Sequence, residues 1–396
     1  MQIFYNIFYS LFYCKLLLLW VPSSILQSVL ALSIIFLALT IFLWQRRIVG
    51  AYLLPRSMST FLWFLFSLVL SFVNVLIIEG NVVSAFSDIM KFITMLCIFY
   101  VFHSDPSDTI LKYRYISYII LIHMIVAIIG YPLGLGKEYG GVYRPHGIAG
   151  TVNILSNLAL FSSAYFGVKF VYKRKLDINL FILISSFIVV FISGTLKNVL
   201  VLMVLPVIYV VLNSKNKVKS ILFVILIFIP LAYLFIINTA ISERMNEVIS
   251  SGIDVQATQG DQLGSSAAWR VLHWKLLLMD WWNNYTLNGS GIGQVVYMNA
   301  LKTIKGTGFD AHSDWIGFFV ELGPVLFLSF AYFNLRFLYN IFTIPRSSNS
   351  SVDALFFAFI SLLVSMSFGP VVYSVAYFYL FWALYGLESK HKNVNS

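Results

Sequence analysis

Charged residues are scarce in this sequence: Asp, Glu, Lys and Arg make up 11% of the 396 residues, and 60% are hydrophobic. Soluble domains average about 25% charged residues and 45–50% apolar residues. A soluble protein this apolar would expose large hydrophobic patches and aggregate. The composition therefore excludes a soluble enzyme. It also excludes a nucleic-acid-binding protein, although the net charge is +10.

Cysteines and the usual cofactor motifs are also few or missing. The two cysteines, Cys14 and Cys97, both lie in apolar segments, so they indicate neither a disulfide framework nor a metal site. The sequence has no Walker loop, no His-Glu-x-x-His pair and no Cys-x-x-Cys pair. We therefore expect no metal, no cofactor and no chemistry driven by nucleotide hydrolysis.

Long apolar segments are abundant. A helix needs about 20 apolar residues to cross the hydrocarbon core of a bilayer. Twelve segments approach this length, so the sequence predicts an all-α, polytopic membrane protein with about 12 transmembrane helices. The segments are Phe4–Val21, Ile25–Trp44, Thr60–Ile78, Ala85–Phe102, Tyr115–Tyr131, Gly147–Val168, Asn179–Ile192, Val199–Leu212, Ile221–Ile237, Trp315–Phe333, Ala354–Phe368 and Val371–Leu387.

These segments divide one membrane domain into three parts. Residues 1–237 hold helices 1–9, residues 238–311 form one long loop, and residues 312–396 hold helices 10–12 and a tail. Lys and Arg gather in one set of alternate loops, as in Lys169–Lys175. Because basic loops stay in the cytoplasm, both termini are predicted inside and the long loop outside.

The long loop is too short for an ordinary domain and too long for a simple connector, which is typical of functional loops. Within it, Ser265–Trp282 is predicted to form an amphipathic helix on the membrane surface. Trp269, Leu272, Leu276 and Met279 recur at helical spacing and are its predicted buried face. The following Asn288–Gly293 stretch is predicted to be a glycine-rich turn.

Four residues that could carry chemistry fall on the predicted outer side: Arg144, Lys197, Arg270 and His312. Arginine matches phosphate oxygens with its fork of donors, and lysine binds phosphate as a point charge. Histidine accepts protons near neutral pH. Together they could hold a lipid diphosphate and deprotonate a hydroxyl. Taken singly, each is also explained as an interfacial residue that contacts lipid headgroups or backbone.

Three further sites deserve mention. Glu321 lies in the tenth apolar segment, where a carboxylate is by default functional or paired. His273 lies near Arg270 on the loop helix and could support it. Asp88 and Lys91, three residues apart in the fourth segment, are expected to pair with each other.

The motifs of the long loop and the tenth segment resemble those of the bacterial O-antigen polymerase and O-antigen ligase superfamily. Members show an Arg-x-x-x-Trp helix, a Gly-x-Gly turn, and a His-Asn/Ser before a helix that carries Glu-x-Gly. The matching residues here are Arg270 with Trp274, then Asn288–Gly293, His312-Ser313 and Glu321-Leu322-Gly323.

The resemblance extends upstream to Tyr143–Gly147 and to the Ser193–Lys197 hairpin, and covers about Tyr143 to Leu326. The sequence departs from the family in two places. Lys197 replaces the usual arginine, and Leu326 replaces a glycine that is prominent in ligases. The second departure favours a polymerase.

The resemblance implies a metal-independent, inverting glycosyltransferase at the periplasmic face of the bacterial inner membrane. The donor would be an oligosaccharide on undecaprenyl diphosphate. In a polymerase the acceptor is another lipid-linked repeat unit, and in a ligase it is the lipid A–core of lipopolysaccharide. Membrane lipids and a chain-length regulator protein are the other expected partners.

The same resemblance assigns roles to residues. His312, Arg270 and Arg144 would be catalytic, with His312 taking the acceptor proton and the arginines stabilising the diphosphate. Substrate binding would fall to Lys197, Glu321 and His273. A transporter of lipid-linked oligosaccharides is the alternative from another class. It would need polar residues along its helices and access from both sides, whereas here the candidates gather on one side.

Overall fold

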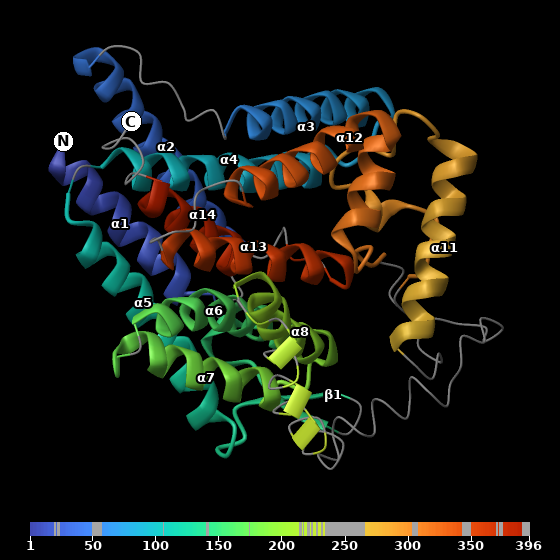
Figure 1. Ribbon diagram of the computed structural model, residues 1–396. Coiled ribbons are helices and arrows are strands. Elements are labelled where there is room, and N and C mark those ends of the chain that lie inside the picture. Colours follow the sequence, from blue (N-terminus) through green and yellow to red (C-terminus); the bar gives the residue numbers. More distant parts are fainter. Residues whose placement is uncertain are drawn as a thin grey trace.

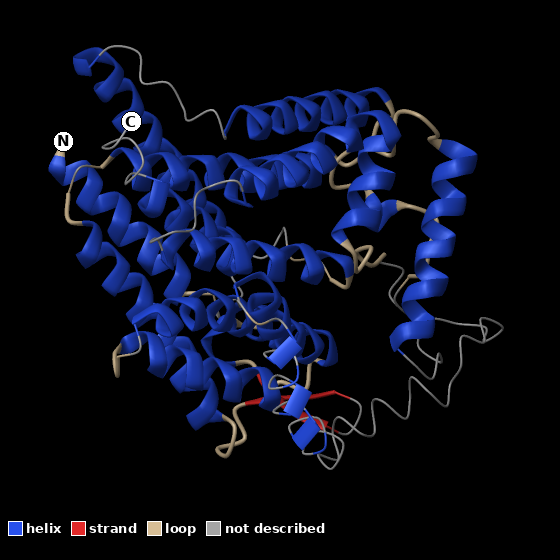
Figure 2. Cartoon of the chain, viewed as in Figure 1, coloured by secondary structure: helices blue, strands red, loops and turns tan. Residues whose placement is uncertain are grey.

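The computed structural model describes the chain except residues 50–57, most of 214–265, residues 303–307, 343–349, 372–374 and 390–396, and a few single positions. The described part is a bundle of helices with one small hairpin (Figures 1 and 2). The helices are α1 Gln2–Leu17, α2 Ser24–Val49, α3 Ser59–Ile77, α4 Val82–Ser104, α5 Thr109–Gly130, α6 Val152–Lys173, α7 Ile178–Ile192, α8 Leu196–Asn213, α11 Ser266–Asn284, α12 Asp314–Phe342, α13 Ser350–Ser367 and α14 Val375–Ser389.

The predicted class, an all-α polytopic membrane protein, is confirmed. Within the described residues, six helices are long and apolar enough to cross a membrane, namely α2 to α6 and α12. Helices α7, α8 and α13 are apolar but shorter. The ninth predicted segment, Ile221–Ile237, lies largely outside the described residues. The total of twelve spans therefore stays a prediction.

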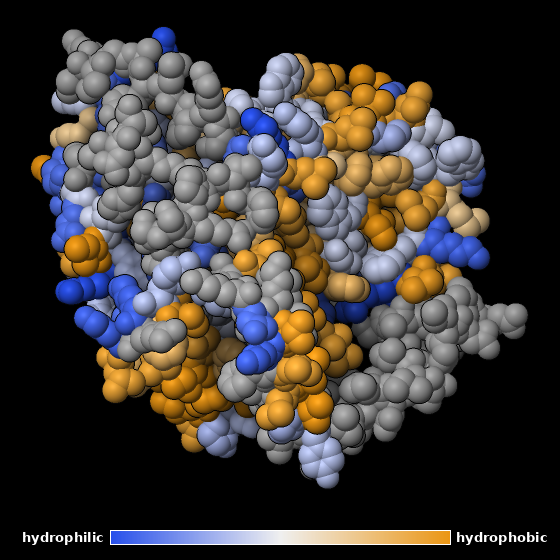
Figure 3. All heavy atoms as spheres, viewed as in Figure 1, coloured by the Kyte–Doolittle hydropathy of each residue, from blue (hydrophilic) through white to orange (hydrophobic). Residues whose placement is uncertain are grey.

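Helices α4, α6, α13 and α14 pack against one another in the centre of the bundle (Figure 1). In α6, 78% of the most apolar window is buried, against 33–44% in the other candidate spans. This difference separates a central helix from helices with one face available to lipid. Figure 3 shows apolar side chains over α3 and α12, where Trp63, Phe66 and Leu328 are exposed.

The two ends of the bundle differ. At one end, the first turns of α1 meet the last turn of α4, with the Tyr5 hydroxyl 3.4 Å from Ser104 Oγ. The last residue of α14, Ser389, hydrogen-bonds there to His103 at 2.8 Å. Helix α11 lies across the opposite end (Figure 1). Both ends of the described chain therefore lie on the side away from the long loop, as the predicted topology requires.

Helix α12 is broken, which the sequence analysis did not anticipate in Trp315–Phe333. Gly323 has φ 69° and ψ 169°, a conformation that only glycine adopts without strain, and Pro324 follows it. The piece before the break runs across the outer end, and the piece after it runs along α3 (Figure 1). The break thus places the first part of the predicted span across the end of the bundle that α11 covers.

A two-stranded hairpin is the other departure from the predicted helices. Strands β1 (Gly136–Tyr139) and β2 (Val142–Pro145) are antiparallel, with Lys137 opposite Arg144. The helix predicted from Gly147 begins instead at Val152, after a short 3-10 turn. Gly147 and Gly150 both have positive φ, at 51° and 81°, and this interrupts a regular helix.

Candidate active site

His312 stands in a strained segment that joins the long loop to α12. Its φ of 52° is uncommon outside glycine, and strain of this kind gathers at functional sites. Helix α11 holds the segment in place. The Trp269 ring meets the His312 ring edge to face at 4.9 Å, and Trp274 Nε1 donates a hydrogen bond to the Ala311 carbonyl.

The hydrogen bond of His312 fixes which ring nitrogen can accept a proton. Nδ1 lies 2.8 Å from the carbonyl oxygen of Asp310. A carbonyl only accepts, so Nδ1 must carry the hydrogen and Nε2 keeps its lone pair. Burial lowers the pKa of His312, the bond to Asp310 opposes this, and the charges of Arg270 and Lys197 lower it further. The imidazole is therefore neutral near pH 7, as a general base must be.

Two cations lie beside His312. The charge of Arg270, on α11, acts on both His312 and Lys197, and that of Asp314 acts on Lys197. A β-carbon at Gly369 would lie 2.5 Å from Nζ of Lys197, so the ammonium rests directly against the backbone there. The structure thus brings together three residues that are 42 to 115 positions apart in sequence (270 − 197 = 73, 312 − 270 = 42, 312 − 197 = 115).

Arg144 approaches the same group from β2. It is only 6% exposed, and its Nε lies 3.8 Å from the place that a β-carbon on Gly194 would take. Gly194 belongs to the turn between α7 and α8, and Lys197 follows it in the first turn of α8. That turn is fixed to α6, because Asn198 Nδ2 donates to Ser156 Oγ at 2.8 Å. The hairpin therefore places Arg144 against Gly194, three residues before Lys197.

His273 has a different environment from the one predicted. It is fully buried, and its ring stacks on Trp269 at 4.9 Å. Burial lowers its pKa to about 4, and nearby His312 lowers it as well. In these surroundings, His273 is better placed to hold the Trp269 ring than to contact a ligand. The assignment of His273 to substrate binding stays a prediction.

The buried face of α11 is rotated from the predicted one. His273, Leu277 and Asp280 are its buried residues, whereas Met279 is 50% exposed. Leu272 and Leu276 are only half-buried. The prediction followed apolar spacing alone, but two polar side chains lie on the inner face. Asp280 is stabilised there by a backbone N–H of the loop, that of Asn299, at 3.0 Å.

The predicted glycine-rich turn is confirmed, and it packs onto the break in α12. Gly289, Gly291 and Gly293 all have positive φ. The break frees carbonyls of the preceding helical turn, and the glycine turn satisfies two of them: the N–H of Ser290 donates to Val320 at 2.8 Å and that of Gly291 to Glu321 at 2.9 Å. The Gly-x-Gly and Glu-x-Gly motifs therefore form one packed unit.

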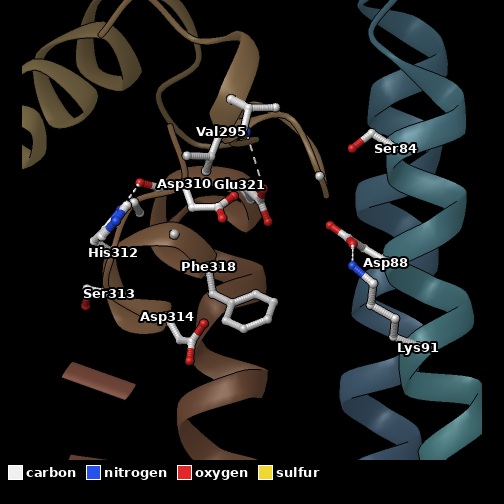
Figure 4. Close-up of a pocket in the computed structure, with 14 residues that line it drawn as sticks. Ser84, Asp88, Lys91, Val295, Asp310, His312, Ser313, Asp314, Phe318 and Glu321 are labelled. Atoms are coloured by element: carbon white, nitrogen blue, oxygen red, sulfur yellow. Dashed lines mark hydrogen bonds and ion pairs between the residues drawn. The ribbon is translucent and has the colours of Figure 1, made fainter. Parts of the chain in front are cut away.

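Beside this unit lies a cavity of about 210 Å³ between α4 and the start of α12 (Figure 4). Glu321 points into it and accepts a hydrogen bond from the Val295 N–H at 3.3 Å. The expected pair Asp88–Lys91 is confirmed at 2.6 Å and lies on the opposite wall. The lining residues are Ser84, Asp88, Lys91, Gly293, Val295, Val296, Asp310, Ala311, His312, Ser313, Asp314, Gly317, Phe318 and Glu321.

Sequence reasoning missed Asp310 and Asp314 as site residues. Asp310 lies two residues before His312 and Asp314 two residues after it. This spacing was the only feature of the sequence that could have identified them. Sequence reasoning did foresee Asp88 and Lys91, but only as a local pair. Across the described residues, no three His, Cys, Asp or Glu side chains are arranged to hold a metal ion.

Comparison with known proteins agrees with the motifs. Residues 181–331 match the O-antigen ligase family, and this confirms the resemblance to the O-antigen polymerase and ligase superfamily. The matched segment includes Lys197, Arg270, His312 and Glu321, and Arg144 lies outside it. No curated protein matches the chain.

Proposed function

We propose that this chain, a member of the O-antigen polymerase and ligase superfamily by its residues 181–331, is a polysaccharide polymerase of the bacterial inner membrane. It joins undecaprenyl-diphosphate-linked repeat units at the periplasmic face. The observation that carries the proposal is His312, with Nε2 available to accept a proton, beside Arg270 and Lys197.

The reaction is one inverting glycosyl transfer. The acceptor hydroxyl oxygen attacks the anomeric carbon of the donor sugar, and its proton passes to Nε2 of His312. The bond between that carbon and the diphosphate oxygen breaks, and its electron pair stays on the diphosphate. The products are a lengthened glycan and undecaprenyl diphosphate, and His312 then returns the proton to solvent or to the leaving group.

The cations supply the electrostatic part of catalysis. Negative charge on the diphosphate grows as the glycosidic bond breaks, and preorganised positive groups stabilise it most strongly in the transition state. Arg270 and Lys197 lie beside His312, and Arg144 approaches from the hairpin. These groups come from the chain itself, so the proposal needs no metal ion.

A ligase is the second candidate function, since the matched family carries that description. Leu326, where ligases have a glycine, favours the polymerase. A transporter fits less well, because the candidate residues gather at one end of the bundle. A chain-length regulator protein and membrane lipids complete the proposed partners.

Reconstitution tests the function. Purified protein in lipid nanodiscs receives undecaprenyl-diphosphate-linked repeat units together with EDTA, and products are separated on a gel. A ladder of longer lipid-linked glycans is the result expected of a polymerase. Product only after addition of lipid A–core would identify a ligase. The absence of any new glycosidic bond in both arms would contradict the proposal.

Substitutions test the assigned roles. His312→Ala should reduce the rate about 100- to 10,000-fold, as loss of a general base does. Arg270→Ala should reduce it about 100- to 1,000-fold, by analogy with loss of one oxyanion-hole donor. Arg270→Lys should recover part of the loss, because the charge returns without the fork. Lys275→Ala, an exposed residue of the same helix, is the matched control. Full activity in both alanine variants of the site would exclude this mechanism.

A further inference from the structure

The cavity and helix α11 lie on two sides of one short segment, residues 310–314. Asp310 and Glu321 point toward Asp88 on α4, whereas the His312 ring points to the other side of the segment (Figure 4). On that other side it meets Trp269 of α11. The segment therefore has the carboxylates of the cavity on one side and helix α11, which carries Arg270, on the other, with His312 between them.

We propose that the cavity is the subsite for the acceptor sugar, and that it selects a neutral sugar. This inference rests on the proposed glycosyl transfer. A group of carboxylates alone would not identify a ligand. Here they line a partly open cavity of about 210 Å³, which has room for one sugar ring beside the segment that carries His312.

The charges of the cavity decide which part of the substrate fits. The charge of Asp310 acts on Asp88, and the charges of Asp88 and Asp310 act on Glu321. Lys91 is the opposing cation, and it is already paired with Asp88 at 2.6 Å. A diphosphate would meet net negative charge here, so its place is with the cations beside His312. A polyhydroxyl ring suits the cavity, because carboxylates accept hydrogen bonds from hydroxyl groups.

The cavity is also preorganised for such a ligand. Glu321 is almost completely buried and is oriented by the Val295 N–H. Asp314 accepts a hydrogen bond from the Val371 N–H at 2.7 Å. Phe318 supplies an apolar surface on the same side as Asp314 (Figure 4). A few fixed polar groups on an apolar wall are typical of small-molecule sites.

The position of the cavity determines where the acceptor and the donor bind relative to each other. His312 is among the residues that line the cavity, so a sugar bound inside places its hydroxyl groups next to the segment that carries the imidazole. The donor diphosphate is assigned to Arg270 and Lys197, the two cations whose charges act on His312. Separate subsites let the attacking oxygen and the leaving group lie on opposite sides of the anomeric carbon, as inversion requires.

The test separates the acceptor from the donor. The acceptor is the repeat-unit glycan on a short alkyl chain without diphosphate, and the donor is the lipid-linked repeat unit. Asp88→Asn and Asp310→Asn should each raise the KM for the acceptor about 10- to 100-fold, as loss of a charged hydrogen-bond partner does. The KM for the donor should not change. Glu79→Gln, exposed at the same end of the molecule and outside the cavity, is the control.

A second readout reports on charge and not on folding. Asp310→Asn should increase the use of an acceptor that ends in a uronic acid, relative to the neutral acceptor. Unchanged acceptor KM in both variants, or an equal rise in donor KM, would overturn the acceptor subsite. If the unmodified protein forms no glycosidic bond with any acceptor, the proposed function itself fails, and the two failures are thereby distinguished.

Discussion

At the scale of single residues, His312 combines three properties that suit a general base. Its backbone is held in a strained conformation, its Nδ1 hydrogen bonds to a carbonyl, and its pKa is lowered by burial and by neighbouring cations. The carbonyl of Asp310 orients the ring, and the Glu321 carboxylate is engaged by Val295 instead. The residues around His312 therefore determine both which ring nitrogen carries the hydrogen and that the imidazole is neutral.

The charge of Arg270 gives a prediction about pH. A general base must be unprotonated, so activity falls on the acid side as pH drops through the pKa of His312. That pKa lies below its ordinary 6.5, and the charge of Arg270 contributes to the lowering together with that of Lys197, while Asp310 opposes it. Arg270→Gln removes one cation, so the acid limb of the remaining activity should move to higher pH.

The measurement is the pH–rate profile of this variant, each point normalised to the maximum. Lys275→Gln removes a cation from the exposed face of the same helix and should leave the limb in place. A limb that stays put or moves to lower pH in Arg270→Gln would show that Arg270 does not act on the base.

Gly369 gives a second prediction at this scale. A β-carbon there would lie 2.5 Å from Nζ of Lys197, closer than any contact allows, so the flexible ammonium would have to move. Gly369→Ala should raise the KM for the lipid diphosphate donor about tenfold, the effect of weakening one charged contact. In a Lys197→Met background the same change should have little effect. Equal effects in both backgrounds would mean that Gly369 acts independently of Lys197.

At the scale of elements, the glycine turn and the broken helix α12 depend on each other. A β-carbon on Gly289 would lie 2.3 Å from the Glu321 carbonyl oxygen, and one on Gly323 would lie 2.2 Å from the Leu287 carbonyl oxygen. Each glycine lets the other backbone approach closely enough to hydrogen-bond. The conformation of each motif therefore depends on the backbone of the other.

Helix α11 carries a prediction about packing. Leu277 is fully buried against Val295, Met298 and Val320, whereas Leu278 is 36% exposed. Leu277→Lys places an unpaired charge in an apolar cluster and should destabilise the docked helix by at least about 2 kcal/mol. Leu278→Lys should be tolerated. Thermal unfolding of the purified variants, followed by fluorescence-detected gel filtration, compares them, and similar midpoints would refute the assigned face.

At the scale of the whole molecule, the two ends of the bundle carry different chemistry. At the end where α1 begins and α14 ends, two buried ion pairs join neighbouring helices. They are Lys112–Asp105 and Lys169–Glu388, and the Lys169–Glu388 distance is 2.8 Å. The opposite end carries the cations, the strained histidine and the cavity. Reactions are therefore expected on one face only, which favours a fixed site over alternating access.

Topology is predicted at the same scale. In a protein with Cys14 and Cys97 replaced by alanine, Lys275→Cys on α11 should react with an impermeant thiol reagent in intact spheroplasts. Gln2→Cys, at the other end of the bundle, should react only after lysis. Both positions are exposed in the folded protein. The reverse pattern of labelling would place the site in the cytoplasm.

The sequence by itself determined that this is a membrane protein, where most of its helices lie, and which side chains are candidates for the site. Apolar length is a local property, so α2, α3, α4 and α5 could be located from composition alone. Three local features could also be predicted from the sequence, because each depends on neighbours within a few residues. They are the Gly-x-Gly turn, the Asp88–Lys91 pair and the position of His312.

The tertiary structure alone decided where those groups meet. The charges of Lys197 and Arg270 act on His312 from α8 and α11, and the hairpin places Arg144 against Gly194. No local pattern encodes the distances between such elements. The break at Gly323 depends on a turn more than thirty residues earlier (323 − 289 = 34), whose N–H groups complete the interrupted helix. The buried face of α11 includes His273 and Asp280, because partners from other segments satisfy polar groups that apolar periodicity assigns to solvent.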